Sequence, residues 1–434
     1  MSKRPWNFPF LLATEVSQLP SRYSVCALRS CFMAYLPPHK RHSNDMEKPS
    51  PTAELLAPLF NRKLDLRASG RKVDRSGRII YADQARHKWF IIGDSDDDNL
   101  FPSCVRLEPI ALRANEHRMG EKHLALVYSN VSQGNKEEEE EVVIEPWASI
   151  VVKLLPDLLS SIEHIKNEMN QDEEVKPTLV ARIGKVIFHG TSEFDSNKLP
   201  TRAVMGQLKR SFRTNVSETY IENIRDKVIP LIGVKFEEEK DTYHIKLSDA
   251  EHPHVTLTCK CTALPELNKL ELYKVELNPV RHMVADISCL KQNVDMRVMT
   301  FSKKTVGKLT DDEMEGILDL INSAILDKDV KGGLRWPLGK ASSGDRFKVV
   351  GAWHTVSQSY VNPFVRIKLR NADRYDFKTL VGEVSNEVTF KMKRLTSELL
   401  REKAEVDVIS DMLNENLKLF WNHFVCSATC SSPF

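Results

Sequence analysis

The sequence predicts an α+β fold, in which antiparallel strands carry packed helices behind a disordered, basic amino-terminal tail. Three observations lead to this prediction. Short segments of alternating apolar and polar residues follow one another through the second half of the chain, separated by Pro, Asn or Asp. Such short connections suit antiparallel pairing, because parallel strands need long crossovers. Apolar residues at helical spacing flank these segments, and residues 33–80 are rich in Pro, Lys and Arg.

Size and composition limit the class of protein. The chain has 434 residues, of which 41% are hydrophobic and 28% charged, so two or three domains can fold without disulfide bonds. Its eight irregularly spaced cysteines are typical of reduced thiols and predict a place in the cytoplasm and/or nucleus. No apolar run approaches the roughly 20 residues that cross a bilayer, so no membrane partner is expected.

Charge is unevenly distributed along the chain. Residues 1–85 hold 14 Lys and Arg against 7 Asp and Glu, whereas the whole chain carries a net charge of only +2. A basic tail on a mildly acidic body is compatible with a polyanion such as RNA as partner. The alternative is that the tail is simply solvated.

The amino-terminal region has two parts. Residues 1–32 hold four basic residues and one acid, which resembles an organellar transit peptide and leaves an organellar location as the alternative. The competing interpretation is an extension ahead of a start at Met33, and we favour it. Residues 33–78 form the expected disordered, Pro-rich basic tail.

A small α+β unit is expected over residues 79–170. A helix should begin at Pro146, because proline suits the first helical turn and apolar residues then recur every four positions. An acidic loop follows the strands at residues 137–141, and the polar stretch 170–177 is the expected boundary to a larger domain, residues 178–426. The expected strands are Lys88–Ile92, Val105–Leu112 and His123–Tyr128.

The larger unit should alternate strands and helices. Thr310 and Glu313 form a capping box that predicts a helix running to about Leu326. Apolar residues from Val406 to Phe424 lie on one face of a further helix. A helix is also expected at Glu218–Leu231, and strands at Val180–Phe188, Thr242–Leu247, Val255–Cys261, Leu270–Leu277, Met283–Ile287 and from Phe347 to about Val381.

The glycine-rich segment 332–346 is the strongest candidate site. It carries the candidate binding residues Arg335, Trp336, Lys340 and Arg346, which can neutralise phosphate or stack on a base. It is not a P-loop, because five residues separate Gly333 from Gly339 and alanine follows the lysine. The alternative is a structural connector with Trp336 buried.

Neither a metal site nor a cofactor is expected. Cys259 and Cys261 lie near His252 and His254, but on an extended strand His254 points away from both thiols. Asp311, Asp312 and Glu313 are explained by their place at a helix start, where acids complement the helix dipole.

No catalytic residue is assigned either. His282 and Asp286 should share one face of a strand, about 13 Å apart, which is too far for direct contact without a bend. No nucleophile, zinc-protease or kinase motif accompanies them.

The chain also resembles known proteins in two places. The segment Tyr35-Leu-Pro-Pro-His-Lys-Arg41 is similar to the Tyr-x-Pro-Pro-His-x-Arg segment in the tail of Ded1-type DEAD-box RNA helicases, where it is implicated in docking translation factors. The resemblance makes Tyr35, Pro37, Pro38, His39 and Arg41 candidate binding residues. Nothing of the helicase core follows, so helicase activity does not carry over.

A longer resemblance covers most of the chain from Met33. The segments 330–346, Leu270–Leu277 and His282–Leu290 resemble a land-plant family of uncharacterised proteins defined by a domain of unknown function. This resemblance implies that residues from about Ile79 to Cys426 fold together. It implies no activity.

These observations favour a non-enzymatic adaptor whose partners are RNA or ribonucleoprotein proteins. Two alternatives stay open. One is a protein-interaction scaffold, which an exposed apolar face on the helix Val406–Phe424 would favour. The other is an enzyme of unrecognised type using His282, Asp286 or nearby acids.

Overall fold

The structure is a computed structural model. The chain forms two compact units, Met1–Asp65 and Leu66–Phe434. The structure describes residues 72–73, 79–92, 101, 105–110, 121–128, 145–171, 174–191, 201–253, 255–307, 309–344 and 346–426, all in the second unit. The acidic loop, residues 1–32, nearly all of the predicted tail and its motif residues Tyr35 to Arg41 lie outside these ranges. Among the described helices, none is long and apolar enough to cross a membrane.

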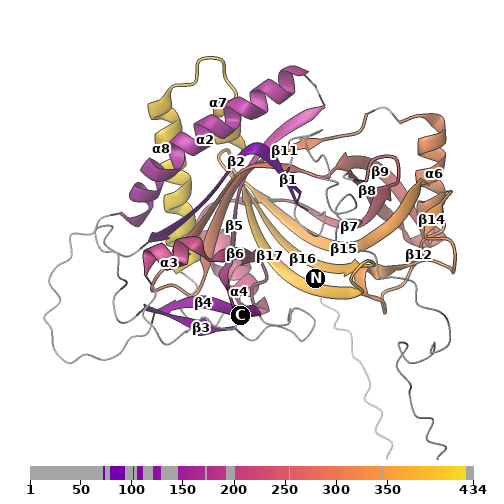
Figure 1. Ribbon diagram of the computed structural model, residues 1–434, viewed down its shortest axis with the longest axis horizontal. Helices are drawn as coiled ribbons and strands as arrows, with labels where there is room; N and C mark the ends of the chain where they lie inside the picture. Colours follow the sequence, from indigo (N-terminus) through magenta and orange to yellow (C-terminus); the bar gives the residue numbers. More distant parts are fainter. Residues whose placement is uncertain are drawn as a thin grey trace, which may run out of the picture. The chain divides into compact units, whose positions relative to one another are not determined.

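Most strands belong to one sheet whose spatial order is β1-β2-β10-β11-β5-β17-β16-β15-β7-β8-β9 (Figure 1). Every neighbouring pair along this order is antiparallel except β2 and β10, which confirms the predicted class of sheet. The strands span β1 Lys72–Val73, β2 Ile80–Ile92, β5 Val175–Thr191, β7 Lys235–Asp249, β8 Thr256–Leu264, β9 Lys269–Leu277, β10 Val280–Cys289, β11 Asp295–Lys304, β15 Phe347–Val361, β16 Arg366–Asp376 and β17 Val381–Lys391.

The sheet closes on itself between β9 and β11. Glu276 of β9 forms an antiparallel bridge with Thr305, which directly follows β11. The backbone N–H of Val306 donates to the carbonyl oxygen of Val275 at 3.0 Å. We call the eight strands that this seam joins, β11-β5-β17-β16-β15-β7-β8-β9, the strand ring.

Smaller strands extend the sheet outside the strand ring. β4 and β6 pair with the carboxy-terminal part of β5, β3 pairs with β4, and β14 pairs with β15. β12 and β13 form a separate two-stranded sheet. Their bounds are β3 Val105–Pro109, β4 Glu121–Tyr128, β6 Lys209–Arg213, β12 Ile325–Leu326, β13 Leu334–Arg335 and β14 Ser342–Ser343.

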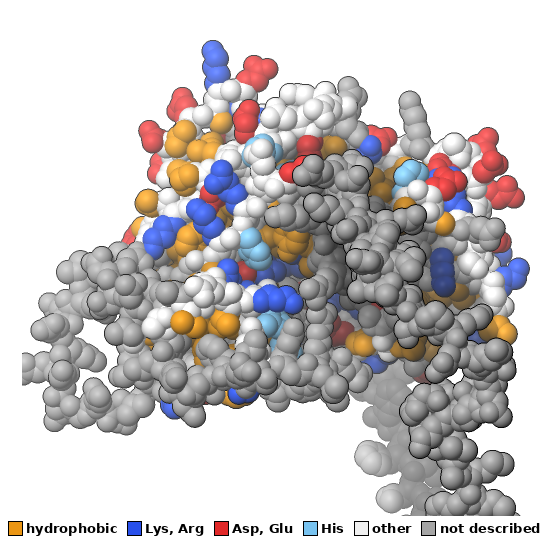
Figure 2. All heavy atoms as spheres, in the orientation of Figure 1, with side chains coloured by type: hydrophobic (Ala, Val, Ile, Leu, Met, Phe, Trp, Pro, Cys, Tyr) orange, Lys and Arg blue, Asp and Glu red, His pale blue; other side chains and the backbone are white. Residues whose placement is uncertain are grey.

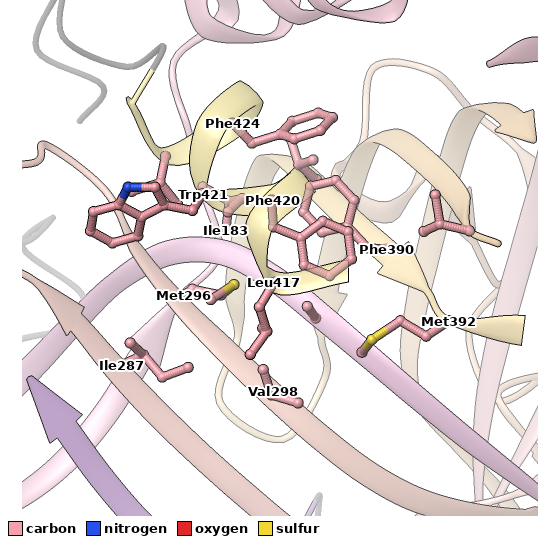
Figure 3. Close-up of a cluster of buried hydrophobic side chains, with 14 of the residues drawn as sticks. Ile183, Ile287, Met296, Val298, Phe390, Met392, Leu417, Phe420, Trp421 and Phe424 are labelled. Carbon is pink, nitrogen blue, oxygen red and sulfur yellow. The ribbon is translucent and has the colours of Figure 1, made fainter. Parts of the chain in front are cut away.

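One hydrophobic core lies between the ring and a group of helices. These helices are α2 Pro146–Gln171, α4 Glu218–Asn223, α7 Lys393–Leu399 and α8 Val406–Phe420 with its continuation η7 Trp421–Val425. Phe390 of β17 stacks on Phe420 with ring centroids 4.3 Å apart and meets the edge of Phe424 at 4.5 Å (Figure 3). The face of the carboxy-terminal helix that carries Leu417 and Phe420 is therefore buried in the core, whereas Val406 and Val408 near its start are exposed.

A second core covers the other half of the ring. Helix α6, Asp311–Asn322, begins with the predicted capping box, in which Thr310 and Glu313 exchange hydrogen bonds. Its buried residues Ile317, Leu320 and Ile321 pack against Ile245, Leu247 and the thiol-bearing Cys259 of β7 and β8. Short helices α3 Arg202–Gln207 and α5 Ile229–Leu231 and the turns η4 Ile224–Val228, η5 Pro265–Leu267 and η6 Lys331–Gly333 complete the fold.

Both cores lie on the outer face of the strand ring, so the inner face must take the alternate residues of each strand. On β16, Ile367 and Leu369 belong to the first core, whereas Lys368 and Arg370 point to the opposite face. The ring thus has an apolar outside covered by helices and an inside that is largely polar, apart from a buried cluster that includes Val180, Met299 and Phe301. This arrangement creates the candidate site.

The expected units 79–170 and 178–426 are joined in the structure. β2 of the first pairs with β10 of the second, and α2 packs on β10, β11 and β5. Their division near residues 170–178 stays a prediction.

Candidate functional site: a basic strand-ring interior

A row of directly paired residues crosses five strands on the inner face. Arg374 of β16 pairs with Trp353 of β15, which pairs with His244 of β7. His244 then pairs with Lys260 of β8, and Lys260 with Lys274 of β9. Residues opposite each other in antiparallel strands project to the same face. All five side chains therefore belong to the ring interior.

Other strands add basic residues to the same face. Arg182 of β5 pairs with Thr389 of β17, which pairs with Lys368 of β16. Two residues along these strands, Glu387 pairs with Arg370. We call the following residues the interior cluster: Arg182, Lys260, Lys274, Lys303, Lys368, Arg370, Arg374, Lys391, Glu276 and Glu387. The cluster holds eight basic side chains and two carboxylates, and the same face also carries Glu238, opposite Ser359, and Glu383, opposite Arg374.

The members of the interior cluster face one another across the ring. Burial, together with the positive charges of Lys260, Lys391 and Arg370, lowers the pKa of Lys303 on β11 to about 8. These neighbours come from β8, β17 and β16. Because charges influence a pKa strongly only over short distances, the strands of opposite walls bring their side chains into one space.

This space is reached by solvent. The side chains of Lys260, Arg374, Arg370 and Lys274 keep between 19% and 35% of their surface accessible. Other members of the interior cluster are strongly buried, and burial lowers the pKa of Arg182 to about 10 and that of Lys368 to about 8. In the space-filling view, acidic side chains lie along the upper edges of the described surface, and several lysine and arginine side chains lie nearer its centre (Figure 2).

The two carboxylates of the interior cluster are held ionised. Burial alone would raise the pKa of Glu387, but the guanidinium groups of Arg374, Arg370 and Arg182 outweigh burial and hold the pKa at about 2. Glu276 has a pKa of about 2 for the same reason, with Lys260 and Lys274 as its partners. Both acids are thus paired with basic side chains, and the negative charge of Glu238 on the same face acts on Lys368.

Several polar atoms of the interior lack partners. In the described part of the chain, the buried Nε atoms of Arg182 and Arg370 and the buried Oγ of Ser359 form no hydrogen bond. A buried donor without an acceptor costs about 1–3 kcal/mol, so such groups are uncommon. The two guanidinium groups are therefore positioned to donate to an acceptor that the chain itself does not supply.

Trp353 lies among the cations of the row. The Nζ atom of Lys246 is 4.1 Å from its ring centroid, and the guanidinium carbon of Arg374 is 5.4 Å away. Burial lowers the pKa of the neighbouring His244 to about 3, helped by Lys260 and Arg370, so this imidazole is neutral at pH 7. The row therefore presents cations and a neutral ring to the interior.

The predicted loop residues lie outside the interior cluster. Arg335 is exposed and its Nε donates to Asp327 at 2.7 Å. Trp336 is partly buried, and its Nε1 donates to the carbonyl of Leu320 at 2.8 Å. Arg346 pairs with Glu313 at 2.5 Å and with Asp249 at 3.4 Å.

Lys340 is exposed in the same loop. Among the described residues, no hydrogen bond or ion pair joins any two of Arg335, Trp336, Lys340 and Arg346. The structure does not assemble them into one site, and their role in binding stays a prediction.

The histidine and aspartate of the enzyme interpretation lie on opposite faces, contrary to the expected shared face. A β-bulge between Arg281 and Met283 shifts the register of β10. His282 therefore turns outward and lies 3.0 Å from the Oγ of Ser302 and 3.5 Å from Glu168 of α2. Asp286 stays on the inner face and accepts from Nε and Nη2 of Arg297 at 2.5 and 2.9 Å.

The cysteines near His252 are structural. Cys259 and Cys261 are fully buried in the second core, and burial raises the pKa of Cys261 to about 12. His252 instead lies 3.0 Å from Asp249 through its Nδ1 atom.

Fold and site together define a closed antiparallel strand ring with a basic interior and a helix-covered exterior. The chain belongs to the family described as domain of unknown function (DUF7903), whose model matches residues 73–424. No curated protein matches the sequence.

Among solved structures, the chain is similar to the RNA triphosphatase Pct1 of S. pombe, with 12% identity over 67% of this chain and 96% of that one and a TM-score of 0.38. It is also similar to the PH1012 protein from Pyrococcus horikoshii OT3, with 12% identity over 48% of this chain and 86% of that one and a TM-score of 0.22. We infer the function from the site itself.

Proposed function

We propose that the strand ring binds a linear anion carrying several phosphate groups in its interior. The observation that carries this proposal is the excess of basic side chains over carboxylates on the inner face of the closed ring. Because charge interactions strengthen as water is excluded, an anion bound there gains far more than one bound at an exposed lysine.

Phosphate fits the donors better than a carboxylate does. Guanidinium groups match the geometry of phosphate oxygens, and the Nε atoms of Arg182 and Arg370 are without partners. An anion that accepts from them would satisfy donors that are otherwise buried and unpaired.

A chain of phosphates fits better than a single one. Lys368, Arg370 and Arg374 follow one another along β16 on the inner face. At about 3.3 Å per residue, the stretch from Lys368 to Arg374 spans roughly 20 Å. One phosphate group cannot contact both ends, whereas a linear oligophosphate can contact several of these cations at once.

The test is calorimetric titration of the full chain with sodium tripolyphosphate. Lys303→Met and Lys368→Met each remove an interior charge without depriving a carboxylate of its ion-pair partner, and we expect at least a tenfold loss of affinity, about 1.4 kcal/mol. Lys340→Met is the matched control, because it removes an exposed lysine of the predicted loop. No binding by the wild type, or equal effects of all three substitutions, would refute the proposal.

Association with RNA or ribonucleoprotein proteins is a second proposal. It is supported by the basic composition of residues 1–85 and by the motif from Tyr35 to Arg41. UV crosslinking to RNA in cells tests it, comparing the wild type with a deletion of residues 33–48 and with Arg335→Glu/Lys340→Glu. Crosslinking that is absent in the wild type would remove this proposal and leave the ring proposal untouched.

A further inference from the structure

A cavity of about 280 Å³ lies where the turn between β9 and β10 meets the end of helix α2. Strand pairing builds its floor. Ile80 of β2 pairs with Val280 of β10, which pairs with Ser302 of β11. Two residues further along β11, Lys304 pairs with Val175 of β5. Neighbouring strands thus present these five side chains to one face of the sheet.

This cavity is separate from the interior of the strand ring. Successive side chains of a strand point to opposite faces, so Ser302 and Lys304 project away from the side that Lys303 occupies. No described residue that lines the cavity belongs to the interior cluster. A ligand in the cavity would therefore leave the ring interior open to its own ligand, and the two sites can be tested independently.

The walls of the cavity suit a small aliphatic group. A water molecule takes up roughly 30 Å³ in the liquid, so the cavity has the volume of about nine waters and holds a compound the size of a single amino acid. Among the described residues that line it, none is aromatic, and five are aliphatic: Ile80, Val175, Val255, Leu277 and Val280. Moving an aliphatic side chain of a ligand from water onto these residues is favourable.

An acid is held in place at the cavity wall. The hydroxyl of Ser302 donates to Oε2 of Glu168 at 2.9 Å, and Nε2 of His282 lies 3.0 Å from the same hydroxyl oxygen. A hydroxyl has a single proton to donate, so Ser302 accepts its other hydrogen bond from Nε2–H of His282. His282 and Ser302 are both buried, whereas Glu168 keeps 29% of its side-chain surface accessible. The carboxylate is therefore oriented by the protein and can still accept from an ammonium group of a ligand.

An amide at the same wall lacks an acceptor. Asn278 is 5% exposed, and its backbone N–H donates to the carbonyl oxygen of Thr256 at 3.1 Å. Its buried Nδ2 atom forms no hydrogen bond with any residue that the structure describes. Buried donors are rarely left without an acceptor, so this amide indicates a polar group that the chain itself does not supply.

The cavity carries one charge of each sign. Glu168 and Lys304 are the charged residues among the described residues that line it. A purely anionic ligand would pair with Lys304 but meet the like charge of Glu168, and a purely cationic ligand would meet the reverse. A ligand with both an ammonium and a carboxylate group complements both residues, and its carboxylate also supplies an acceptor for Asn278.

We propose that this cavity binds an aliphatic α-amino acid in its zwitterionic form. The ammonium group of the ligand donates to Glu168, its carboxylate accepts from Lys304 and from the amide of Asn278, and its side chain packs on the aliphatic walls. The strands and helix α2 already position the residues for all of these contacts. The proposal goes beyond the anion binding proposed for the ring, because the cavity lies on the opposite face of β11 and takes a different ligand.

Calorimetric titration of the full chain with L-leucine tests the proposal. Isocaproate and isoamylamine carry the same branched group but lack the ammonium and the carboxylate, respectively. We expect leucine to bind at least about tenfold more tightly than either compound, and to bind equally well in the presence of excess tripolyphosphate. No binding of leucine, equal binding of the three compounds, or displacement of leucine by tripolyphosphate would overturn the inference.

Substitutions at the wall separate recognition of charge from structural damage. Glu168→Gln and Lys304→Met should each weaken leucine binding at least about tenfold, whereas Glu163→Gln, at an exposed acid on the same helix, should leave it unchanged. Glu168→Gln should also strengthen the binding of isocaproate, because it removes the repulsion of the ligand carboxylate. A parallel loss of affinity for all three compounds, in a variant that circular dichroism shows to be folded, would overturn the inference.

Discussion

The Nη2 atom of Arg374 lies 2.5 Å from the Oε1 atom of Glu387, across strands β16 and β17 of the ring. Glu387 is nearly fully buried, and it is the one acid that holds Arg374, Arg370 and Arg182 together. Removing one member of a buried ion pair leaves the other charge without compensation, which is far costlier than losing an exposed pair.

Replacement of Glu387 should therefore destabilise the protein strongly. We expect Glu387→Gln to lower the free energy of unfolding by about 3–5 kcal/mol, because the charges on three guanidinium groups become uncompensated. Denaturation in urea measures the change. Glu402→Gln, an exposed acid just beyond α7, is the control and should alter the stability by less than about 0.5 kcal/mol.

Lysine replacements in the interior should act in the opposite direction. Lys303→Met and Lys368→Met each remove a charge that burial and neighbouring cations make unfavourable, so each should raise the free energy of unfolding by on the order of 1 kcal/mol. The same variants should bind tripolyphosphate more weakly. Lower stability in both would show that these lysines serve the fold and not a ligand.

Stability should also rise with pH above neutrality. Burial lowers the pKa of Lys303 and Lys368 from 10.5 to about 8, so between about pH 8 and 10.5 the unfolded chain binds more protons than the folded one. The free energy of unfolding therefore increases with pH across this window. Urea denaturation at pH 7.5, 8.5 and 9.5 measures the slope, which the Lys303→Met/Lys368→Met variant should reduce.

Binding of the anion should take up protons near pH 8. Phosphate groups beside Lys303 and Lys368 favour the charged form of each amine and so raise its pKa. Titrations with tripolyphosphate in Tris and in HEPES should differ in apparent enthalpy, because each buffer supplies the protons with a different heat. The double methionine variant should show the same enthalpy in both buffers.

The loop 332–346 contains a glycine that the fold requires. Gly332 has a φ of 80°, and a Cβ atom there would lie 2.5 Å from the carbonyl oxygen of Ala352. We expect Gly332→Ala to cost about 3 kcal/mol or more, since steric conflict adds to the backbone strain. Gly339→Ala, with a φ of 77° but no atom within 4 Å, should cost only about 1 kcal/mol. Equal losses of stability in the two variants would show that the backbone shifts and so relieves the contact between the new Cβ atom and Ala352.

Element types were predictable where local chemistry decides them. The capping box at Thr310 and the apolar stripe of the carboxy-terminal helix predict helices that the structure contains. Strand lengths were underestimated, as at β7, where Thr242–Leu247 was expected and the strand runs from Lys235 to Asp249. The run of acidic residues in the first half of β7 is typical of a loop. Nothing in the local sequence shows that these charges face other strands.

The interior cluster could not be predicted for a related reason. On β16, charged residues alternate with Ile367 and Leu369, a pattern that normally indicates a strand with its polar face in water. Only the closure between Glu276 and Thr305, which depends on residues far apart in the sequence, turns that face inward. The pattern of Arg366, Lys368, Arg370 and Arg374 was the one available signal.

The bulge in β10 shows a second limit of sequence periodicity. A strict two-residue period places His282 and Asp286 on the same face, but one extra residue at the bulge separates them. Nothing in the sequence Val280–Cys289 marks that position, because no glycine or proline interrupts it. The bulge separates His282 from Asp286, two of the residues that the enzyme hypothesis named beside nearby acids.

The order in which the ring can form follows from its pairing. Arg182 of β5 pairs with Thr389 of β17, which lies more than 200 residues later in the chain. The pairing of β5 with β17 can therefore form only after nearly the whole protein has been synthesised. Contacts this distant in sequence form slowly, because the chain loses conformational entropy before these contacts can stabilise the fold. The last strand to arrive, β17, carries Glu387, which pairs with the arginines of β16 and acts on Arg182 of β5. The basic residues of β5 and β16 are therefore brought together by the same strand that supplies the acid between them.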